Sequence, residues 1–271
     1  MANTAKEIAI ISVPRSGTNF FCDTLGEFTE IASLFELLNP RGVFGLERYP
    51  ELLKSITATL GIDASKATDP TFIEKVAHQR HDFLAALRTA VAGIGLSAFS
   101  YKLFPEQIPY QVLENILTDR TKLFFFITRS RIDTYISYRK ALELDEWVGK
   151  KTHDINIEIT FDQFMEWATK IDAWYENAEK ILREHDQRYS IFSYDSDINV
   201  PKPTLIEKQY FTLRSMGLDA AYPTSIAPPS FRKQDKIAGP FTKIANGEEL
   251  KQIFLEKKLL GKYVLRAPLT R

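Results

Sequence analysis

Residues 8–21 read IAIISVPRSGTNFF, and this stretch decides what kind of fold the chain can form. An apolar run of strand length ends at Val13, and a turn containing Gly17 separates it from a helix expected over residues 17–28. Backbone N–H groups at a helix start point outward and carry about half a positive charge, so they attract anions. The stretch therefore predicts a buried strand over residues 7–13, a tight turn and a phosphate-binding helix start.

The side chains in the turn strengthen the expectation of an anion site. The residues that can contact a phosphate there are Arg15, Ser16, Gly17, Thr18 and Asn19. A nucleoside-triphosphatase loop also needs a lysine followed by Ser or Thr, because the lysine bridges the outer phosphates and the hydroxyl holds magnesium. No lysine lies between residues 13 and 22. We therefore expect a phosphate site that works without a metal ion, with an ordinary strand–helix turn as the alternative.

A second apolar run leads to a similar set of side chains. Residues 122–127 have the length and composition of a strand, and Asp133 follows as the expected cap or first-turn residue of a helix. Ser137 lies one helical turn further on, on the same face, and Arg129 at the strand end can reach the same volume. An arginine fork beside a hydroxyl predicts a second phosphate pocket, whereas the alternative is a solvated basic helix start.

Together the two stretches resemble the donor site of the sulfotransferases that use 3′-phosphoadenosine-5′-phosphosulfate (PAPS). Residues 14–18 resemble the 5′-phosphosulfate loop of that family. The pattern Arg129-x-x-x-Asp133-x-x-x-Ser137 resembles its 3′-phosphate motif, at the expected separation of more than one hundred residues. The family often has proline where this chain has Arg131, a change that we expect to alter the turn without removing the phosphate ligands.

The resemblance implies an α/β fold, namely a P-loop-NTPase-like three-layer sandwich with a central parallel sheet flanked by helices, in one domain over residues 1–271. It also implies transfer of a sulfuryl group from PAPS to a hydroxyl acceptor, with 3′-phosphoadenosine 5′-phosphate (PAP) as product. Residues 33–40 are similar to a glutamate-containing segment of bacterial and Golgi-type carbohydrate sulfotransferases. This similarity implies Glu36 as general base and a carbohydrate or glycolipid acceptor; a solvated glutamate in an Asn-Pro turn is the alternative.

Three further basic residues are candidate site residues because of their positions in the sequence. Lys102 closes a strand expected over residues 96–103, where it faces the transferred group or the acceptor, or else is solvated. Arg232 and Lys233 match in character the family's basic loop over the 3′-phosphate and adenine, with a solvated charged loop as the alternative. The polar residues 144–159 are expected to form a loop over the acceptor site.

Two other functions are also compatible with these motifs. A P-loop kinase or phosphotransferase would need the lysine and magnesium ligands that the loop lacks, and a magnesium-dependent kinase or ATPase activity would favour it. A nucleotide-binding regulator without catalysis would bind the product nucleotide, would have no acceptor, and would not depend on Glu36.

Composition narrows the classes of partner. The chain has 271 residues with 35 basic and 35 acidic side chains, whereas bulk nucleic-acid binding needs a basic excess, so we expect small-molecule partners and no nucleic acid. The single cysteine, Cys22, cannot form an internal disulfide and is expected to be a buried apolar residue. The N-terminal apolar run is too short for a secretory signal, and no apolar stretch is long enough to span a bilayer. These features predict a cytoplasmic protein, and they leave the oligomeric state open.

The remaining elements follow from breakers, caps and periodicity. In chain order we expect irregular structure over 30–70, a helix from Asp69-Pro70 to about residue 91, a short helix over 111–117, a long helix from the capping box of Thr160 and Gln163, a strand over 189–194, and a helix over 203–216 closed by Gly217. His78 and His81 are expected to be surface or core residues of the second of these elements. The aromatic stripe of the long helix fits core packing better than a sugar-binding wall.

Overall fold

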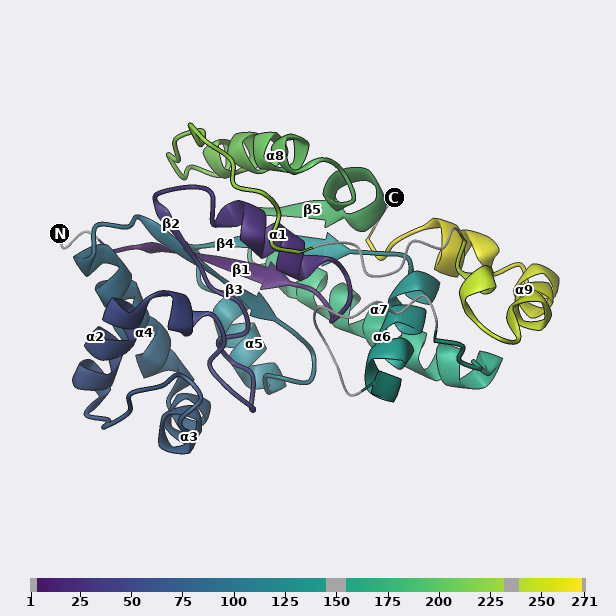
Figure 1. The fold of residues 1–271 in the computed structure, drawn as a ribbon, viewed down its shortest axis with the longest axis horizontal. Helices are drawn as coiled ribbons and strands as arrows, with labels where there is room; N and C mark the ends of the chain where they lie inside the picture. Colours follow the sequence, from purple (N-terminus) through teal and green to yellow (C-terminus); the bar gives the residue numbers. More distant parts are fainter. Residues whose placement is uncertain (1–3, 145–154, 232–238, 270–271) are drawn as a thin grey trace.

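The computed structural model describes residues 4–144, 155–231 and 239–269, and its centre is a five-stranded sheet in which every pairing is parallel. The strand order is β2-β3-β1-β4-β5, so the first strand occupies the middle (Figure 1). The strands are β1 (Lys6–Ile11), β2 (Ile31–Ser33), β3 (Ala98–Leu103), β4 (Lys122–Thr128) and β5 (Tyr189–Ser193). The strands expected near residues 7–13, 96–103, 122–127 and 189–194 are confirmed.

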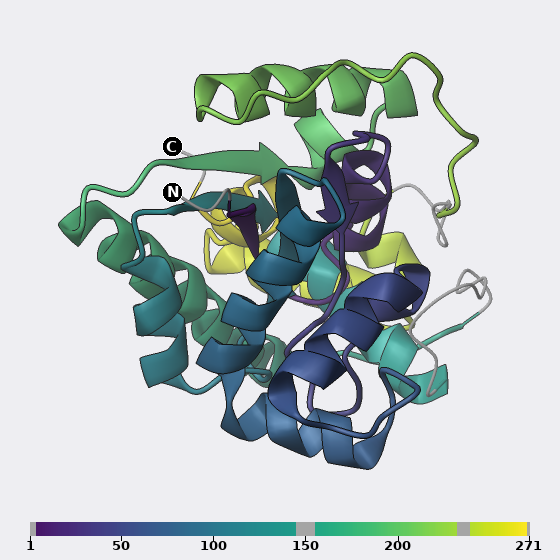
Figure 2. The ribbon, with the colours of Figure 1, turned by 90° about the vertical axis from the view of Figure 1, so that its left-hand side faces the viewer.

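Helices cover both faces of the sheet. They are α1 (Thr18–Leu25), α2 (Pro50–Leu60), α3 (Pro70–His78), α4 (Arg80–Gly93), α5 (Tyr110–Leu117), α6 (Arg131–Leu144), α7 (Phe161–Glu184), α8 (Lys202–Ser215) and α9 (Gly247–Glu256). Side chains of α1 and α8 pack on one face, and those of α2, α4, α5 and α7 pack on the other. Figure 2 shows α8 (green) above the sheet and α2, α3 and α4 (blue) below it.

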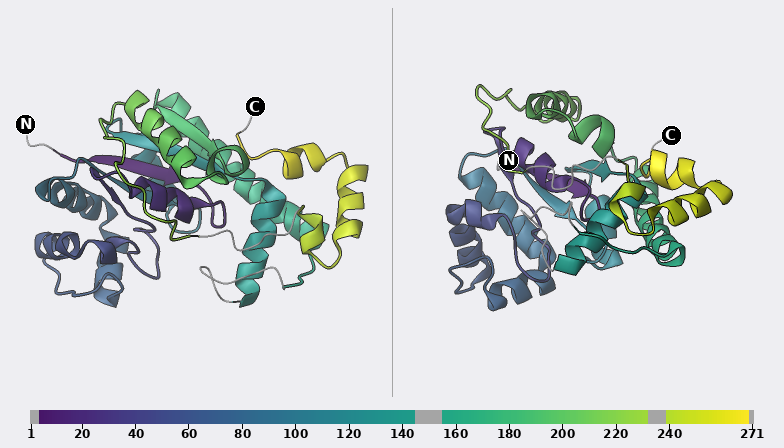
Figure 3. Two further views of the ribbon diagram at one scale, coloured as in Figure 1. Left: turned by 45° about the horizontal axis from the view of Figure 1, so that its top comes forward. Right: turned by 45° about the vertical axis from the view of Figure 1, so that its right-hand side comes forward.

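The central strands are apolar throughout because both of their faces are buried. In β4, Phe124 and Phe126 join the core under α5 and α7, whereas Phe125 and Ile127 join the core under α1 and α8. A third cluster forms beyond the sheet, where α6 and the start of α7 pack against α9 and the helical turn η4 (Gly261–Leu265). In both views of Figure 3 these yellow C-terminal helices lie against the teal α6 and α7.

The expectation of irregular structure over residues 30–70 is wrong in two places. Residues 31–33 form the edge strand β2, and an eleven-residue helix, α2, begins at Pro50. Proline is favourable at the first helical position because its missing N–H has no partner there in any case. Gly61 ends this helix in the left-handed region, at φ +63°, as C-terminal glycines commonly do. Pro50 therefore starts an element that it was expected to break.

The helix expected from Asp69 to residue 91 is also divided. Asp69 caps its start by accepting a hydrogen bond from the Thr71 N–H (2.9 Å), but the chain leaves helical geometry at Gln79. In a continuous helix, Phe72 and Phe83 would be about 16 Å apart along the axis. The break brings their ring centroids to 6.1 Å in an edge-to-face contact. Aromatic packing therefore accounts for two helices, and His78 and His81 lie on different ones.

Within the described ranges, none of the helices combines the length and the apolar composition needed to cross a bilayer.

Candidate functional site

The candidate site lies at the carboxyl ends of β1 and β4, which are adjacent parallel strands. After β1 the chain continues to strands on one side, and β4 and β5 lie on the other, so the strand order reverses between β1 and β4. Open parallel sheets bind ligands in the crevice at such a point. The turn of residues 14–17 follows β1, and Arg129 follows β4, so the fold brings the two sequence motifs to one edge.

The turn after β1 adopts an unusual backbone conformation. Gly17 has φ +87°, and a Cβ atom there would lie 2.6 Å from the Cδ2 atom of Tyr194, so glycine is required for two reasons. Arg15 has φ +71°, a left-handed conformation that costs a non-glycine residue about 1–2 kcal/mol. The first turn of α1 follows directly, with N–H groups that have no intrahelical partner. The turn is thus shaped so that the helix start faces out of the sheet edge.

The two predicted phosphate pockets are in direct contact. The Arg15 Nε atom donates to the Ser137 Oγ atom at 3.0 Å, across 122 residues of sequence. The Arg129 Nη1 atom donates to the main-chain carbonyl of Arg15, also at 3.0 Å. The Arg129 guanidinium lies 4.3 Å from the ring centroid of Tyr194, in cation–π geometry. The turn and the start of α6 (Arg131–Leu144) therefore form one site.

Positive charge dominates this site. Burial and the neighbouring guanidinium of Arg129 lower the pKa of Arg15 to about 10. Burial acts to raise the pKa of Asp133, but the charges of Arg129 and Lys243 outweigh it and hold that pKa below its usual value. The Lys243 Nζ atom donates to Asp133 at 2.8 Å, and Arg129 lies 3.9 Å from the same carboxylate. A bound dianion would relieve the repulsion between Arg15 and Arg129.

Three buried polar atoms at this edge have no hydrogen-bond partner among the described residues. They are the Ser16 Oγ, Thr128 Oγ1 and Arg129 Nε atoms. Buried polar groups are nearly always hydrogen-bonded, so these atoms keep hydrogen-bonding capacity that a water molecule or a bound group can use. Two hydroxyls and a guanidinium N–H are donors suited to phosphate or sulfate oxygens.

A second group of contacts lies beside the first, around Glu36. The Glu36 Oε2 atom accepts hydrogen bonds from the side-chain amides of Asn39 and Gln107, both at 2.8 Å. The Oε1 atom lies 3.7 Å from the Lys102 Nζ atom, and Lys102 also donates to the Asn19 side chain in the first turn of α1. Glu36 and Lys102 are thus connected to the turn after β1, and the Glu36 side chain is 26% exposed. It is therefore held in place, unlike a freely solvated glutamate.

The alternative of a solvated Lys102 is wrong. Its side chain is fully buried, with the Nζ atom 4.7 Å from the ring centroid of Phe35. Burial lowers the pKa of Lys102 despite the opposing effects of Cys22 and Glu36. The expectation that Cys22 is a buried apolar residue is confirmed, and burial raises the pKa of its thiol to about 11. A strand end is buried here because β3 lies between β1 and β2.

The residue that departs from the family pattern has a structural role. Arg131 is the first residue of α6, and its Nε atom donates to Asp172 of α7 at 2.7 Å. Its Nη1 atom donates to the carbonyls of Lys262 and Arg266, both at 3.0 Å. The side chain is thus directed into the C-terminal cluster, and Ser137 keeps its contact with Arg15.

The aromatic stripe of α7 packs in the core, as expected. Two of its members also form hydrogen bonds to the backbone next to the site. The Trp174 Nε1 atom donates at 3.1 Å to the carbonyl of Ser12, which lies two residues before the turn begins at Pro14. The Tyr175 hydroxyl donates to the carbonyl of Ile127 at 2.7 Å, near the end of β4. These contacts tie α7 to the ends of both site-forming strands.

The positions of Arg232 and Lys233, and most of the segment 144–159, lie outside the described residues. The sequence analysis missed Lys243, which adds a buried positive charge at Asp133, because no local motif marks it. It also missed Gln107 as a partner of Glu36. Gln107 lies four residues after the end of the strand that contains Lys102, and this closeness in sequence was the signal that could have identified it.

In the parts of the chain that the structure describes, no three His, Cys, Asp or Glu side chains are grouped as a metal site would require.

No protein-family model matches the chain, and no curated protein matches it. The functional interpretation therefore depends on the motifs and on the geometry of their residues.

Proposed function

We propose that this chain is a PAPS-dependent sulfotransferase on a P-loop-like α/β fold, acting on a hydroxyl acceptor of the carbohydrate or glycolipid class. One observation carries the proposal: the Arg15–Ser137 hydrogen bond of 3.0 Å joins two motifs that lie 122 residues apart. The donor has negative groups at both ends of its ribose, so it needs two anion pockets that share one crevice. A PAPS site of this kind requires the two motifs to meet, as they do here.

In this proposal the donor is held by the residues of both motifs. Residues 14–19 bind the 5′ end through Arg15, the hydroxyls and the amides of the first turn of α1. Arg129 and Ser137 bind the 3′-phosphate, with Arg232 and Lys233 as further candidates. When bound, PAPS supplies the sulfuryl group and a leaving oxygen that gains negative charge. Each preorganised donor aimed at such an oxygen contributes about 2.7–4 kcal/mol to catalysis.

Glu36 is the residue we assign as general base. Its Oε2 atom already accepts two amide N–H groups, so Oε1 is the atom available to take the acceptor proton. General bases contribute about 10²–10⁴-fold to rate when they are positioned within hydrogen-bond reach of the proton. Lys102, held against Asn19 and Glu36, places a second positive charge beside the turn, where it can face the transferred group.

The decisive measurement is the affinity for two nucleotides that differ by one phosphate. Isothermal titration calorimetry with PAP and with adenosine 5′-phosphate is expected to show at least tenfold tighter binding of PAP, in buffer containing EDTA. Equal affinities would refute the 3′-phosphate pocket and with it the proposal. Incubation with radiolabelled PAPS and an extract of the source cells then identifies the acceptor. PAP binding without any transfer would favour a non-catalytic regulator, and magnesium-dependent ATP hydrolysis would favour a phosphotransferase.

A further inference from the structure

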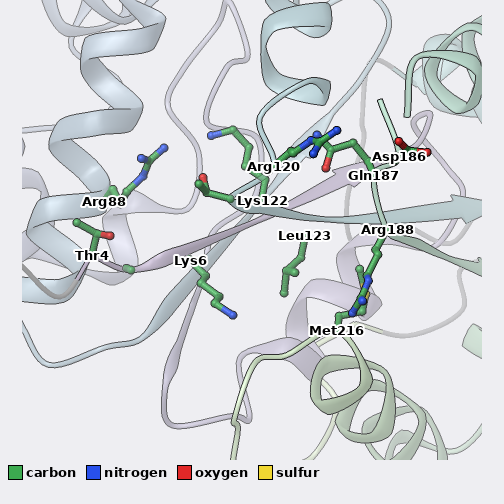
Figure 4. A pocket seen from close by; sticks show the side chains of 12 residues that line it. Thr4, Lys6, Arg88, Arg120, Lys122, Leu123, Asp186, Gln187, Arg188 and Met216 are labelled. Atoms are coloured by element: carbon green, nitrogen blue, oxygen red, sulfur yellow. The ribbon is translucent and has the colours of Figure 1, made fainter. Parts of the chain in front are cut away.

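A second cationic region lies at the opposite edge of the sheet. A cavity of about 600 Å³ opens at the amino ends of β1 and β4 (Figure 4). Its basic lining residues come from β1, α4, the turn before β4, β4 itself and the turn before β5: Lys6, Arg88, Arg120, Lys122 and Arg188. β1 has six residues, so about 20 Å separates this cavity from the candidate donor site.

Two of the five cations, Arg88 and Lys122, are paired with carboxylates and stabilise the fold. Glu7 is buried beside the cavity, and its carboxylate accepts hydrogen bonds from Arg88 Nε (3.0 Å), Lys122 Nζ (2.7 Å) and the Tyr101 hydroxyl (3.0 Å). Asp119 lies 3.0 Å from the Lys122 Nζ atom. Buried charges are stable only when they are paired and hydrogen-bonded, and this cluster satisfies that condition.

The other three cations have no carboxylate partner among the described residues. Lys6 donates to the carbonyl of Gly217 (2.5 Å), and Arg120 donates to the carbonyl of His185 (3.4 Å). No ion pair involves Arg188 in the described part of the chain. Among the described residues named here, five cations and the three carboxylates of Glu7, Asp119 and Asp186 give an excess of two positive charges.

The lining offers further donors to a ligand. The Gln187 Nε2 atom is buried and has no acceptor among the described residues. In Figure 4, Lys6 and Arg188 lie on the same side of the strands as Leu123 and Met216, whereas Arg88 and Lys122 point to the other side, toward Glu7. Guanidinium forks match the oxygens of phosphate and sulfate groups in geometry. A cavity of this size is typical of sites for small molecules.

We propose that this cavity binds a small anion carrying two or more phosphate or sulfate groups. The two strands that begin at the cavity, β1 and β4, are those that lead at their other ends to Arg15 and Arg129. The proposal rests on the cavity alone and does not depend on the function assigned to the other edge. Phosphate and sulfate esters share the chemistry that the lining recognises, and the experiment has one arm for each.

The test is a calorimetric titration of the full-length protein at low salt, with the donor site saturated by PAP if PAP binds. Inorganic tripolyphosphate and a trisulfated heparin disaccharide are the two probes. We expect at least one to bind with one-to-one stoichiometry, and Arg120→Glu/Arg188→Glu to weaken it at least tenfold. If that variant does not fold, Arg120→Gln/Arg188→Gln should weaken binding at least threefold. The probe that binds more tightly identifies the preferred group.

A matched control separates this site from general electrostatics. Lys54→Glu/Lys257→Glu makes the same change in net charge at exposed positions of α2 and just after α9. It should alter probe affinity less than twofold. An equal loss in both double variants, or no binding of either probe to the wild type, would overturn the proposal. The proposal would also be overturned if PAP abolished the binding of tripolyphosphate while Arg120→Glu/Arg188→Glu left that binding unchanged.

Discussion

The two edges of the central sheet both collect arginine and lysine side chains, yet they hold them in different ways. At the amino edge, the buried carboxylate of Glu7 pairs directly with Arg88 and Lys122. At the carboxyl edge, Arg15 donates to a hydroxyl and Arg129 to a main-chain carbonyl. Arg129 also lies 3.9 Å from the Asp133 carboxylate, which is 20% exposed, whereas the Glu7 carboxylate is only 1% exposed. A cation paired with such a buried carboxylate stabilises the fold. The same residue types therefore have different roles at the two edges.

Glu36 and Glu7 provide the strongest contrast, because one is assigned to chemistry and the other to stability. We expect Glu36→Gln to lower kcat by about 10²–10⁴-fold, since the amide cannot accept the acceptor proton. PAP affinity should change less than twofold. Transfer from radiolabelled PAPS to the identified acceptor measures the rate. The exposed Glu51, mutated to Gln, is the matched control and should retain wild-type turnover; retained turnover in Glu36→Gln would remove Glu36 from the role of base.

Glu7→Gln should have the opposite profile. Loss of this carboxylate leaves two buried cations without their counter-charge, which costs about 3–5 kcal/mol in the free energy of unfolding. PAP affinity should be unaffected in the protein that remains folded. Urea denaturation followed by circular dichroism measures the loss. Glu166→Gln removes an exposed ion pair with Lys170 and should leave stability unchanged, and an equally stable Glu7→Gln protein would show that the amino-edge cluster is not structural.

Arg129→Ala examines the 3′ pocket. A hydrogen bond to a charged group contributes about 1.5–3 kcal/mol, so PAP affinity should fall about 10–150-fold. Binding of adenosine 5′-phosphate should fall much less, because that nucleotide lacks the group that Arg129 contacts. Calorimetric titrations of both nucleotides make the comparison. Arg139→Ala, in the helix α6 that follows Arg129, is the control. A uniform loss for the two nucleotides would assign Arg129 to the turn instead.

Ser137→Ala should produce the smallest change of this series. A neutral hydroxyl contributes about 0.5–1.5 kcal/mol, so PAP should bind about 2–10-fold more weakly. Ser137→Thr keeps the hydroxyl and should restore most of the affinity in the same titration. If the threonine variant binds as weakly as the alanine variant, the serine acts by fitting the helix surface and not as a phosphate ligand.

Local patterns in the sequence were sufficient for the elements that form the site. The apolar runs before Pro14 and Arg129 predict two buried strands, and the turn chemistry after each predicts an anion-binding helix start. Both runs are strands in the structure. The same local reasoning failed where packing overrides it. Pro50 begins a helix, and the contact between Phe72 and Phe83 divides another.

By itself, the sequence determined the strand–turn–helix units and the residue types at their ends, because these depend on neighbours a few positions apart. Only the tertiary structure decided which ends meet, since strand order is a property of the whole sheet. That order places Arg15 against Ser137, buries Lys102 beside Glu36, and gathers Lys6 and Arg188 around one cavity at the far edge. Charges brought together from distant segments interact through space, so no local pattern could reveal them.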